Sequence, residues 1–211
     1  MQDVRFSWLF DTQGVSNRPL WDRVVMRSGA AKTLPTRGSI VPGWLLTFAN
    51  RATLNLAQLS PPERAAVLEQ ARLAAKRVAR FGTRTFQFEH GAAMAGSPLG
   101  CGLDIAHLHT VPLAFDLIAA AQPMSGASWT AVDNSEDPWA EIGSDEYLIV
   151  RELDAPRAFV ARLDEPVSQF FRKVIASNVG APDNWDYRLH GGLENVELTV
   201  GAFDHDDQRA G

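Results

Sequence analysis

Two histidines, His107 and His109, lie two residues apart in the segment 100–112, G-C-G-L-D-I-A-H-L-H-T-V-P, which is otherwise mostly glycine, small or apolar. Successive side chains of an extended strand point to opposite faces, so Ile105, His107, His109 and Val111 are expected to share one face. A neutral imidazole carries one donor and one acceptor nitrogen, which suits a nucleophile toward phosphorus, a proton shuttle or a metal ligand. The spacing therefore predicts a histidine site on one face of a strand.

Residues 105–112 resemble the signature strand of the histidine triad superfamily, in which histidines alternate with apolar residues and the strand often ends at proline. Two further segments are similar to that family: 40–46, I-V-P-G-W-L-L, and 86–91, F-Q-F-E-H-G. The three segments occur in the family's order and together cover roughly residues 20–115. This is more specific than an isolated pair of histidines.

The resemblance implies nucleotide chemistry at the α-phosphorus. His107 is similar by position to the middle, nucleophilic histidine, which forms a transient nucleotidyl-histidine, and His109 is similar to the third, which contacts the phosphate or the leaving group. The backbone N–H groups of the glycine-rich segment are expected to hold phosphate oxygens, and these residues are Gly100, Cys101 and Gly102. Three more positions are candidates for nucleotide binding by resemblance: Thr36, Glu89 and His90.

The chain departs from the family pattern at four positions. Ile105 replaces the first histidine, Thr36 stands where many members have a ribose-binding asparagine, Trp44 replaces a histidine, and Gly102 replaces a Ser or Thr that binds phosphate. In the family, the backbone carbonyl of the first histidine orients the nucleophilic ring, and isoleucine keeps that carbonyl. The resemblance therefore implies a nucleotide phosphohydrolase or nucleotidyl transferase that needs no cofactor and no metal.

Two other function classes stay open. One is a catalytically inactive nucleotide-binding protein derived from the same family. The other is a metal-dependent enzyme in which His107 and His109, together with His90 or a carboxylate, hold a divalent ion.

Composition restricts the partners and the compartment. The 211-residue chain is 45% hydrophobic and 21% charged, with a net charge of −5, which argues against broad binding to nucleic acid or to an anionic membrane. No apolar run reaches the length of a membrane span, and the N-terminal residues lack the pattern of a secretory signal, so we expect a cytoplasmic protein. The one cysteine, Cys101, excludes an internal disulfide bond and a multi-cysteine zinc site. The resemblance implies a homodimer that binds a small nucleotide ligand.

Sequence periodicity and turn residues predict an α+β fold with an antiparallel sheet. The clearest helix begins after Ser60, which forms a capping box with Glu63, and ends before Gly82. A second helix is expected from Pro166 to the residue before Gly180.

Strands and loops follow from the remaining segments. Strands are expected at residues 21–27, 40–48, 85–89 and 105–111, and as a hairpin at 147–153 and 157–163. Loops are expected at 28–39 and 122–143. The resemblance divides the chain into a histidine triad-like core, 1–120, and a C-terminal hairpin and helix extension, 121–211, packed together as one structural unit.

Overall fold

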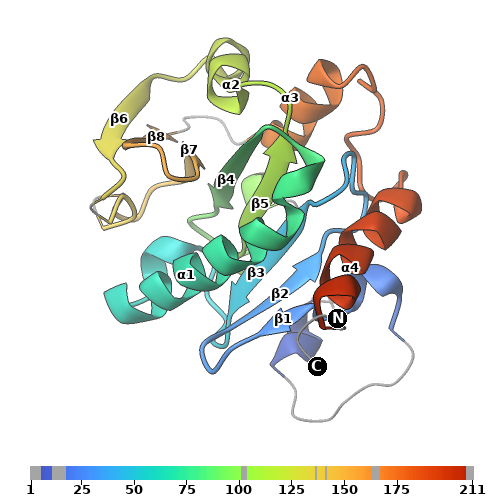
Figure 1. Cartoon of the computed structure of the whole chain (residues 1–211). Coiled ribbons are helices and arrows are strands. Elements are labelled where there is room, and N and C mark those ends of the chain that lie inside the picture. The colour runs from blue at the N-terminus through green and yellow to red at the C-terminus, as the bar shows by residue number, and fades with distance from the viewer. Residues whose placement is uncertain are drawn as a thin grey trace.

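The computed structural model describes residues 6–10, 18–100, 104–135, 137–140, 142–162 and 167–207. Within these ranges the chain forms one eight-stranded sheet in the order β1-β2-β3-β5-β4-β7-β8-β6, with antiparallel neighbours throughout (Figure 1). The strands are β1 (Met26–Arg27), β2 (Ala31–Pro35), β3 (Leu45–Ala49), β4 (Arg84–Gly91), β5 (Leu108–Leu113), β6 (Trp129–Asp133), β7 (Tyr147–Glu152) and β8 (Arg157–Arg162). The helices are α1 (Pro61–Val78), α2 (Leu117–Ser125), α3 (Phe170–Asn178) and α4 (Leu193–Asp207). The predicted α+β class is confirmed.

Helix α1 forms where its sequence predicts it. The carboxylate of Glu63 accepts hydrogen bonds from the backbone N–H of Ser60 at 2.9 Å and from its hydroxyl at 2.7 Å, and Pro61 occupies the first helical position. The apolar stripe that includes Val67 and Ala71 is fully buried against the sheet. This helix fixes one face of the sheet.

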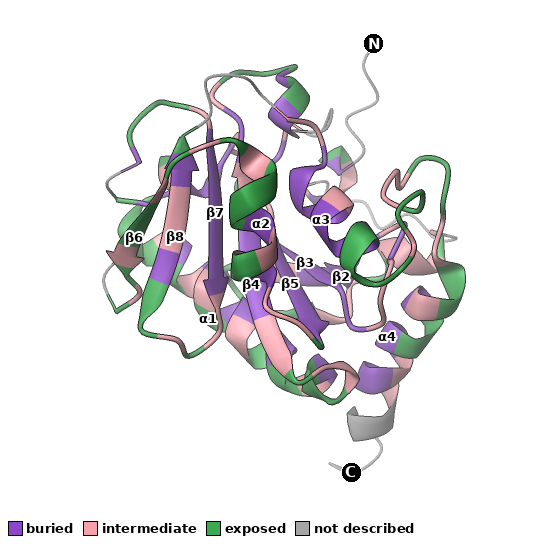
Figure 2. Ribbon diagram, turned by 90° about the horizontal axis from the view of Figure 1, so that it is seen from above, coloured by how far each residue is buried: buried purple, intermediate pink, exposed green. Residues whose placement is uncertain are grey.

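The two faces of the sheet are covered by different helices. On one face, α1 packs on a cluster that includes Leu108 and Ile149. On the other, α2 and α3 cover a core built from Phe88, Val111 and Phe171. Figure 2 shows the resulting buried residues along the central strands. Helix α4 lies near α1 at the β1–β2 side of the sheet, where Phe203 packs.

Several predicted boundaries are wrong. The expected loop 28–39 contains β2, whose residues pair with β1 and β3 on both sides. The expected connection 122–143 contains β6 and the end of α2, and β6 completes the sheet beside β8. In both segments tertiary pairing overrides a weak local propensity.

Other elements differ in their limits. The expected strand 40–48 begins only at Leu45, and the histidine strand begins at Leu108. In the expected strand 21–27, the first two residues end a 3-10 turn and only Met26–Arg27 form a strand, β1. Helix α4 is not predicted from the sequence. Pro166 lies outside the described residues, and the helix expected there begins, in the described part, at Phe170.

The hairpin prediction is confirmed by the antiparallel pairing of β7 with β8. The division at residue 120 stays a prediction, and strands from both sides of it belong to the same sheet, since β4 pairs with β7. Among the described helices, none is both long and apolar enough to cross a membrane.

Candidate functional site

The structure brings three histidines together beneath α3. His109 lies in β5, His107 directly precedes that strand, and His90 lies near the end of β4. The ring centroid of His109 is 4.8 Å from that of His107 and 6.0 Å from that of His90. Phe88, which pairs with His109 across the two strands, stacks on it at 4.4 Å. The three imidazoles therefore form one cluster on one face of the sheet.

The expected alternation of side chains is confirmed although the strand begins later than predicted. Ile105 packs with Phe48, and the ring of His107 stacks on the same Phe48 at 5.5 Å. Ala106 and Leu108 lie in the cluster beneath α1, on the opposite face. Ile105, His107 and His109 thus share a face, as the sequence predicts.

The half-buried ring of His107 is held by a backbone group. Its Nδ1 lies 2.8 Å from the carbonyl oxygen of Ile105. A carbonyl oxygen only accepts, so Nδ1 carries the proton and, in the neutral ring, the lone pair lies on Nε2. This is the orienting contact that the resemblance implies for the first position of the signature, made here by isoleucine.

His109 is buried and held in the opposite tautomer. The indole Nε1–H of Trp44 donates to Nδ1 of His109 at 3.0 Å, which leaves the ring proton on Nε2. Burial lowers the pKa of His109 well below its ordinary value, and repulsion from His107, His90 and Arg172 lowers it further. The ring is therefore neutral near pH 7 and presents an N–H donor from Nε2.

His90 is also neutral. The backbone N–H of Phe171, in the first turn of α3, points to Nε2 of His90 at 3.3 Å. Burial lowers the pKa of His90 to about 3, with smaller contributions from the charges of His107 and Arg172. His90 and His109 are thus buried, uncharged imidazoles near pH 7.

Arg172 of α3 adds positive charge to this environment. Its Nε donates to the carbonyl of Trp185 at 2.7 Å, its Nη2 donates to the carbonyl of Gly38, and the guanidinium lies 4.8 Å from the ring centroid of Trp44. A fixed cation close to three histidines favours an anionic ligand at this face of the sheet.

Glu89, one of the positions expected to bind nucleotide, does not lie in the histidine cluster. It points to the α1 face, where its carboxylate accepts hydrogen bonds from the backbone N–H of Leu56 at 2.7 Å, the indole of Trp139 at 2.8 Å and the hydroxyl of Tyr147 at 2.5 Å. Neighbouring residues of a strand face opposite ways, so Glu89 and His90 are separated by the sheet. Burial raises the pKa of Glu89 to about 7.

The structure describes only some of the other residues predicted to bind the nucleotide or its phosphate. Thr36 is buried just after β2, and its hydroxyl donates to the carbonyl of Arg37 at 3.2 Å; within the described residues it makes no hydrogen bond to the histidines. Gly100 ends a 3-10 turn, and Cys101 and Gly102 lie outside the described residues. The proposed phosphate cradle at these positions stays a prediction.

Trp44 and Arg172 are the site residues that sequence reasoning did not assign. Trp44 directly precedes β3, and Arg172 lies in α3. Neither residue is near the histidines in the sequence. The separation of Glu89 from His90, in contrast, was readable: Phe86, Phe88 and His90 alternate with Gln87 and Glu89.

No protein-family model matches the chain, and no curated protein is significantly similar to it in sequence.

Proposed function

We propose that the protein is a nucleotide phosphohydrolase or nucleotidyl transferase that acts at the α-phosphorus through His107. The observation that carries the proposal is the hydrogen bond from Nδ1 of His107 to the carbonyl oxygen of Ile105 at 2.8 Å. That bond places the lone pair on Nε2 and fixes the plane of the ring, and both support in-line attack by the imidazole.

In the proposed reaction, Nε2 of His107 attacks the α-phosphorus. The bond from phosphorus to the leaving group breaks, the electron pair departs with the leaving group, and the leaving group takes up a proton from the solvent. The nucleotidyl-histidine ring then carries a positive charge, which the Ile105 carbonyl stabilises through Nδ1–H. Water or another acceptor then attacks the same phosphorus and loses its proton to the solvent. The bond from Nε2 to phosphorus breaks, and its electron pair returns to Nε2, which restores neutral His107.

The neighbouring groups support this reaction electrostatically. The Nε2–H of His109 is a donor for a phosphate oxygen or for the leaving group, and its neutral state is maintained by burial. Arg172 contributes a positive charge from the α3 side. Neutral donors and a fixed cation suit charge that spreads over phosphate oxygens in the transition state.

The hydrogen-bonding pattern does not favour the metal-dependent alternative. A metal needs an imidazole lone pair, but Nδ1 of His109 accepts from Trp44 and Nε2 of His90 accepts from Phe171. Within the described residues, no group of three or more His, Cys, Asp and Glu is placed to hold a metal ion.

The proposal is tested by initial rates on a panel of adenosine phosphoramidates and dinucleoside polyphosphates. His107→Ala should abolish turnover of any substrate that the native protein hydrolyses, whereas the exposed His190→Ala serves as a matched control and should retain it. Retained activity in His107→Ala would refute the assignment. Binding of nucleotide without turnover by the native protein would favour the inactive nucleotide-binding alternative.

A further inference from the structure

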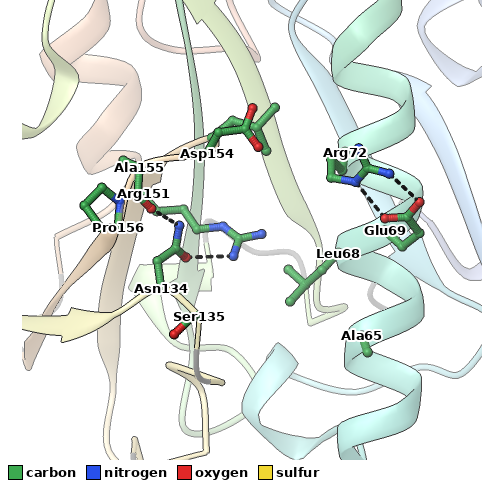
Figure 3. A pocket seen from close by; sticks show the side chains of 11 residues that line it. Ala65, Leu68, Glu69, Arg72, Asn134, Ser135, Arg151, Asp154, Ala155 and Pro156 are labelled. Atoms are coloured by element: carbon green, nitrogen blue, oxygen red, sulfur yellow. Dashed lines mark hydrogen bonds and ion pairs between the residues drawn. The ribbon is translucent and has the colours of Figure 1, made fainter.

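A pocket of about 530 Å³ lies on the α1 face of the sheet, across the sheet from the histidine cluster. It opens between α1 and the turns that follow β6 and β7, and its walls combine apolar side chains, such as Leu68 and Pro156, with polar ones (Figure 3). The polar groups in its lining include Arg151, Asn134, Arg72 and Glu69. Its position makes it independent of the proposed histidine chemistry.

Arg151 is a buried cation in the wall of this pocket. The residue is 9% exposed, and its Nε and Nη2 donate to the same amide oxygen of Gln87 at 3.0 and 2.6 Å. Its Nη1 donates to the amide oxygen of Asn134 at 2.9 Å. These acceptors are neutral, and no described carboxylate forms an ion pair with Arg151. Asp154 and Asp137 attract Arg151 through space, but neither is among its hydrogen-bond acceptors. A buried guanidinium without a directly bonded anion is costly, so an anion in the pocket would stabilise it.

The guanidinium has donors left for such an anion. Arginine carries five N–H groups. Since the hydrogen bonds to Gln87 and Asn134 use three of these groups, one N–H remains on each terminal nitrogen. Figure 3 shows the tip of the guanidinium turned toward Leu68 of α1, across the pocket. Two parallel N–H groups at the tip match the two oxygens of a planar oxyanion.

The guanidinium is also held in place before a ligand arrives. The amide of Asn134 donates to the carbonyl of Ala155 at 2.7 Å, and the amide of Gln87 donates to the hydroxyl of Thr110 at 3.4 Å. Both amides therefore keep their oxygens directed at Arg151. A preorganised donor loses little conformational entropy on binding.

The charges at the rim favour a singly charged ligand. Glu69 pairs with Arg72 at 2.7 Å, and Asp154 lines the pocket beside the hairpin turn. The positive charges of Arg72 and Arg151 are matched by these two carboxylates, so the pocket has no excess positive charge to offset the larger desolvation cost of a dianion such as phosphate. We propose that this pocket binds a small organic monocarboxylate, with its carboxylate on the free edge of the Arg151 guanidinium and its apolar body against Leu68 and Pro156.

The test is a titration of the native protein with benzoate, followed through the Nε–H signal of Arg151 in ¹⁵N-resolved NMR spectra. We expect a saturable shift of that signal. Inorganic phosphate, added at the same ionic strength, should bind more weakly. Arg151→Gln lacks that signal, so benzoate binding to this variant and to the native protein is compared by isothermal titration calorimetry. The variant should bind benzoate about tenfold more weakly or worse, since it removes a charge-assisted pair of hydrogen bonds.

Two further variants keep the test informative if Arg151→Gln fails to fold. Leu68→Trp fills the pocket from α1 and leaves Arg151 intact, so it should abolish the benzoate shift. Arg157→Gln removes an exposed arginine of β8 and should leave benzoate binding unchanged. A native protein that shows no saturable shift, or a Leu68→Trp variant that binds as well as the native protein, would overturn the proposal. Tighter binding of phosphate than of benzoate would contradict the assignment to monocarboxylates. None of these results bears on the histidine cluster.

Discussion

At position 105 the group that contacts His107 is the backbone carbonyl, while the isoleucine side chain packs with Phe6 and Phe48. The side chain and the carbonyl therefore have separable roles. Isoleucine at this position places no imidazole on this face of the sheet, and its backbone carbonyl holds the ring of His107.

Ile105→Val separates these roles. The carbonyl stays in place, so we expect the rate of nucleotide turnover to change by no more than about threefold, a small effect on the transition-state scale. Loss of one buried methylene should lower the free energy of unfolding by about 0.5–1.5 kcal/mol. Initial rates and urea unfolding check the two effects separately, and a large fall in rate without a fall in stability would show that the side chain itself acts in the site.

Trp44 is expected to act on His109 by positioning it. Trp44→Phe keeps an aromatic ring but removes the N–H that binds Nδ1 of His109, and an unpaired buried acceptor costs roughly 1–3 kcal/mol. We expect turnover to fall about ten- to a hundredfold, with little change in KM.

The decisive readout is the tautomer of His109 in ¹⁵N NMR spectra. The native ring should carry its proton on Nε2, and Trp44→Phe should give a mixture of tautomers. Trp185→Phe, at a half-buried position on the segment after α3, is the matched control. An unchanged tautomer of His109 in Trp44→Phe would contradict the proposal that Trp44 positions His109.

Among the elements, α1 and the β7–β8 hairpin were predicted from local patterns, whereas β2, which depends on its pairing partners, was not. Helix α1 has its own capping box and apolar stripe, so its sequence suffices. Strand β2, by contrast, reads A-K-T-L-P and is extended because β1 and β3 pair with it. The same limit applies to the site: alternation places His107 beside His109, but Trp44 arrives through the β3–β5 pairing, which no short-range pattern encodes.

Gly91, the last residue of β4, tests how tightly the sheet is packed around Tyr147. Gly91 lies under the ring of Tyr147, and a Cβ at this position would overlap the ring. Gly91→Ala should displace Tyr147 from Glu89 and lower the free energy of unfolding by about 2 kcal/mol or more, as overpacking does in a dense core.

Gly29→Ala is the matched control, because a Cβ at Gly29 meets no atom within 4 Å. It should leave the free energy of unfolding within about 0.5 kcal/mol of the native value, as surface changes do. Urea unfolding of both variants measures the difference. Equal stabilities would mean that the Tyr147 ring moves aside at little cost.

For the molecule as a whole, stability should depend on pH through buried groups on the two faces. Burial raises the pKa of Glu89 from 4.5 to about 7, so the folded state binds its proton more tightly than the unfolded state. The stability from this group is fully present below pH 4.5 and is lost as the pH rises through about 7. Burial of His90 has the opposite effect, because it lowers the pKa of that ring from 6.5 to about 3. The contribution of His90 to the stability of the fold is present above pH 6.5 and is lost as the pH falls toward 3.

Glu89→Gln isolates the first effect, because glutamine is similar in shape and does not ionise. Between pH 4.5 and about pH 7.5, the free energy of unfolding of the native protein should fall relative to that of Glu89→Gln by up to about 3 kcal/mol, since each pKa unit corresponds to about 1.4 kcal/mol. Urea unfolding of both proteins across this range measures the difference. A difference that stays constant with pH would contradict the raised pKa.

The central claim concerns a covalent bond to His107, and trapping that bond tests it most directly. The native protein is mixed with an adenosine phosphoramidate that it turns over, quenched at alkaline pH, where a phosphoramidate on histidine survives, and digested for peptide mass spectrometry. We expect an adenylyl group on the peptide that contains His107, attached to that residue, present in His190→Ala and absent in His107→Ala. Turnover with the adenylyl group on His90 or His109, or with no protein adduct at any time before the substrate is consumed, would contradict the account.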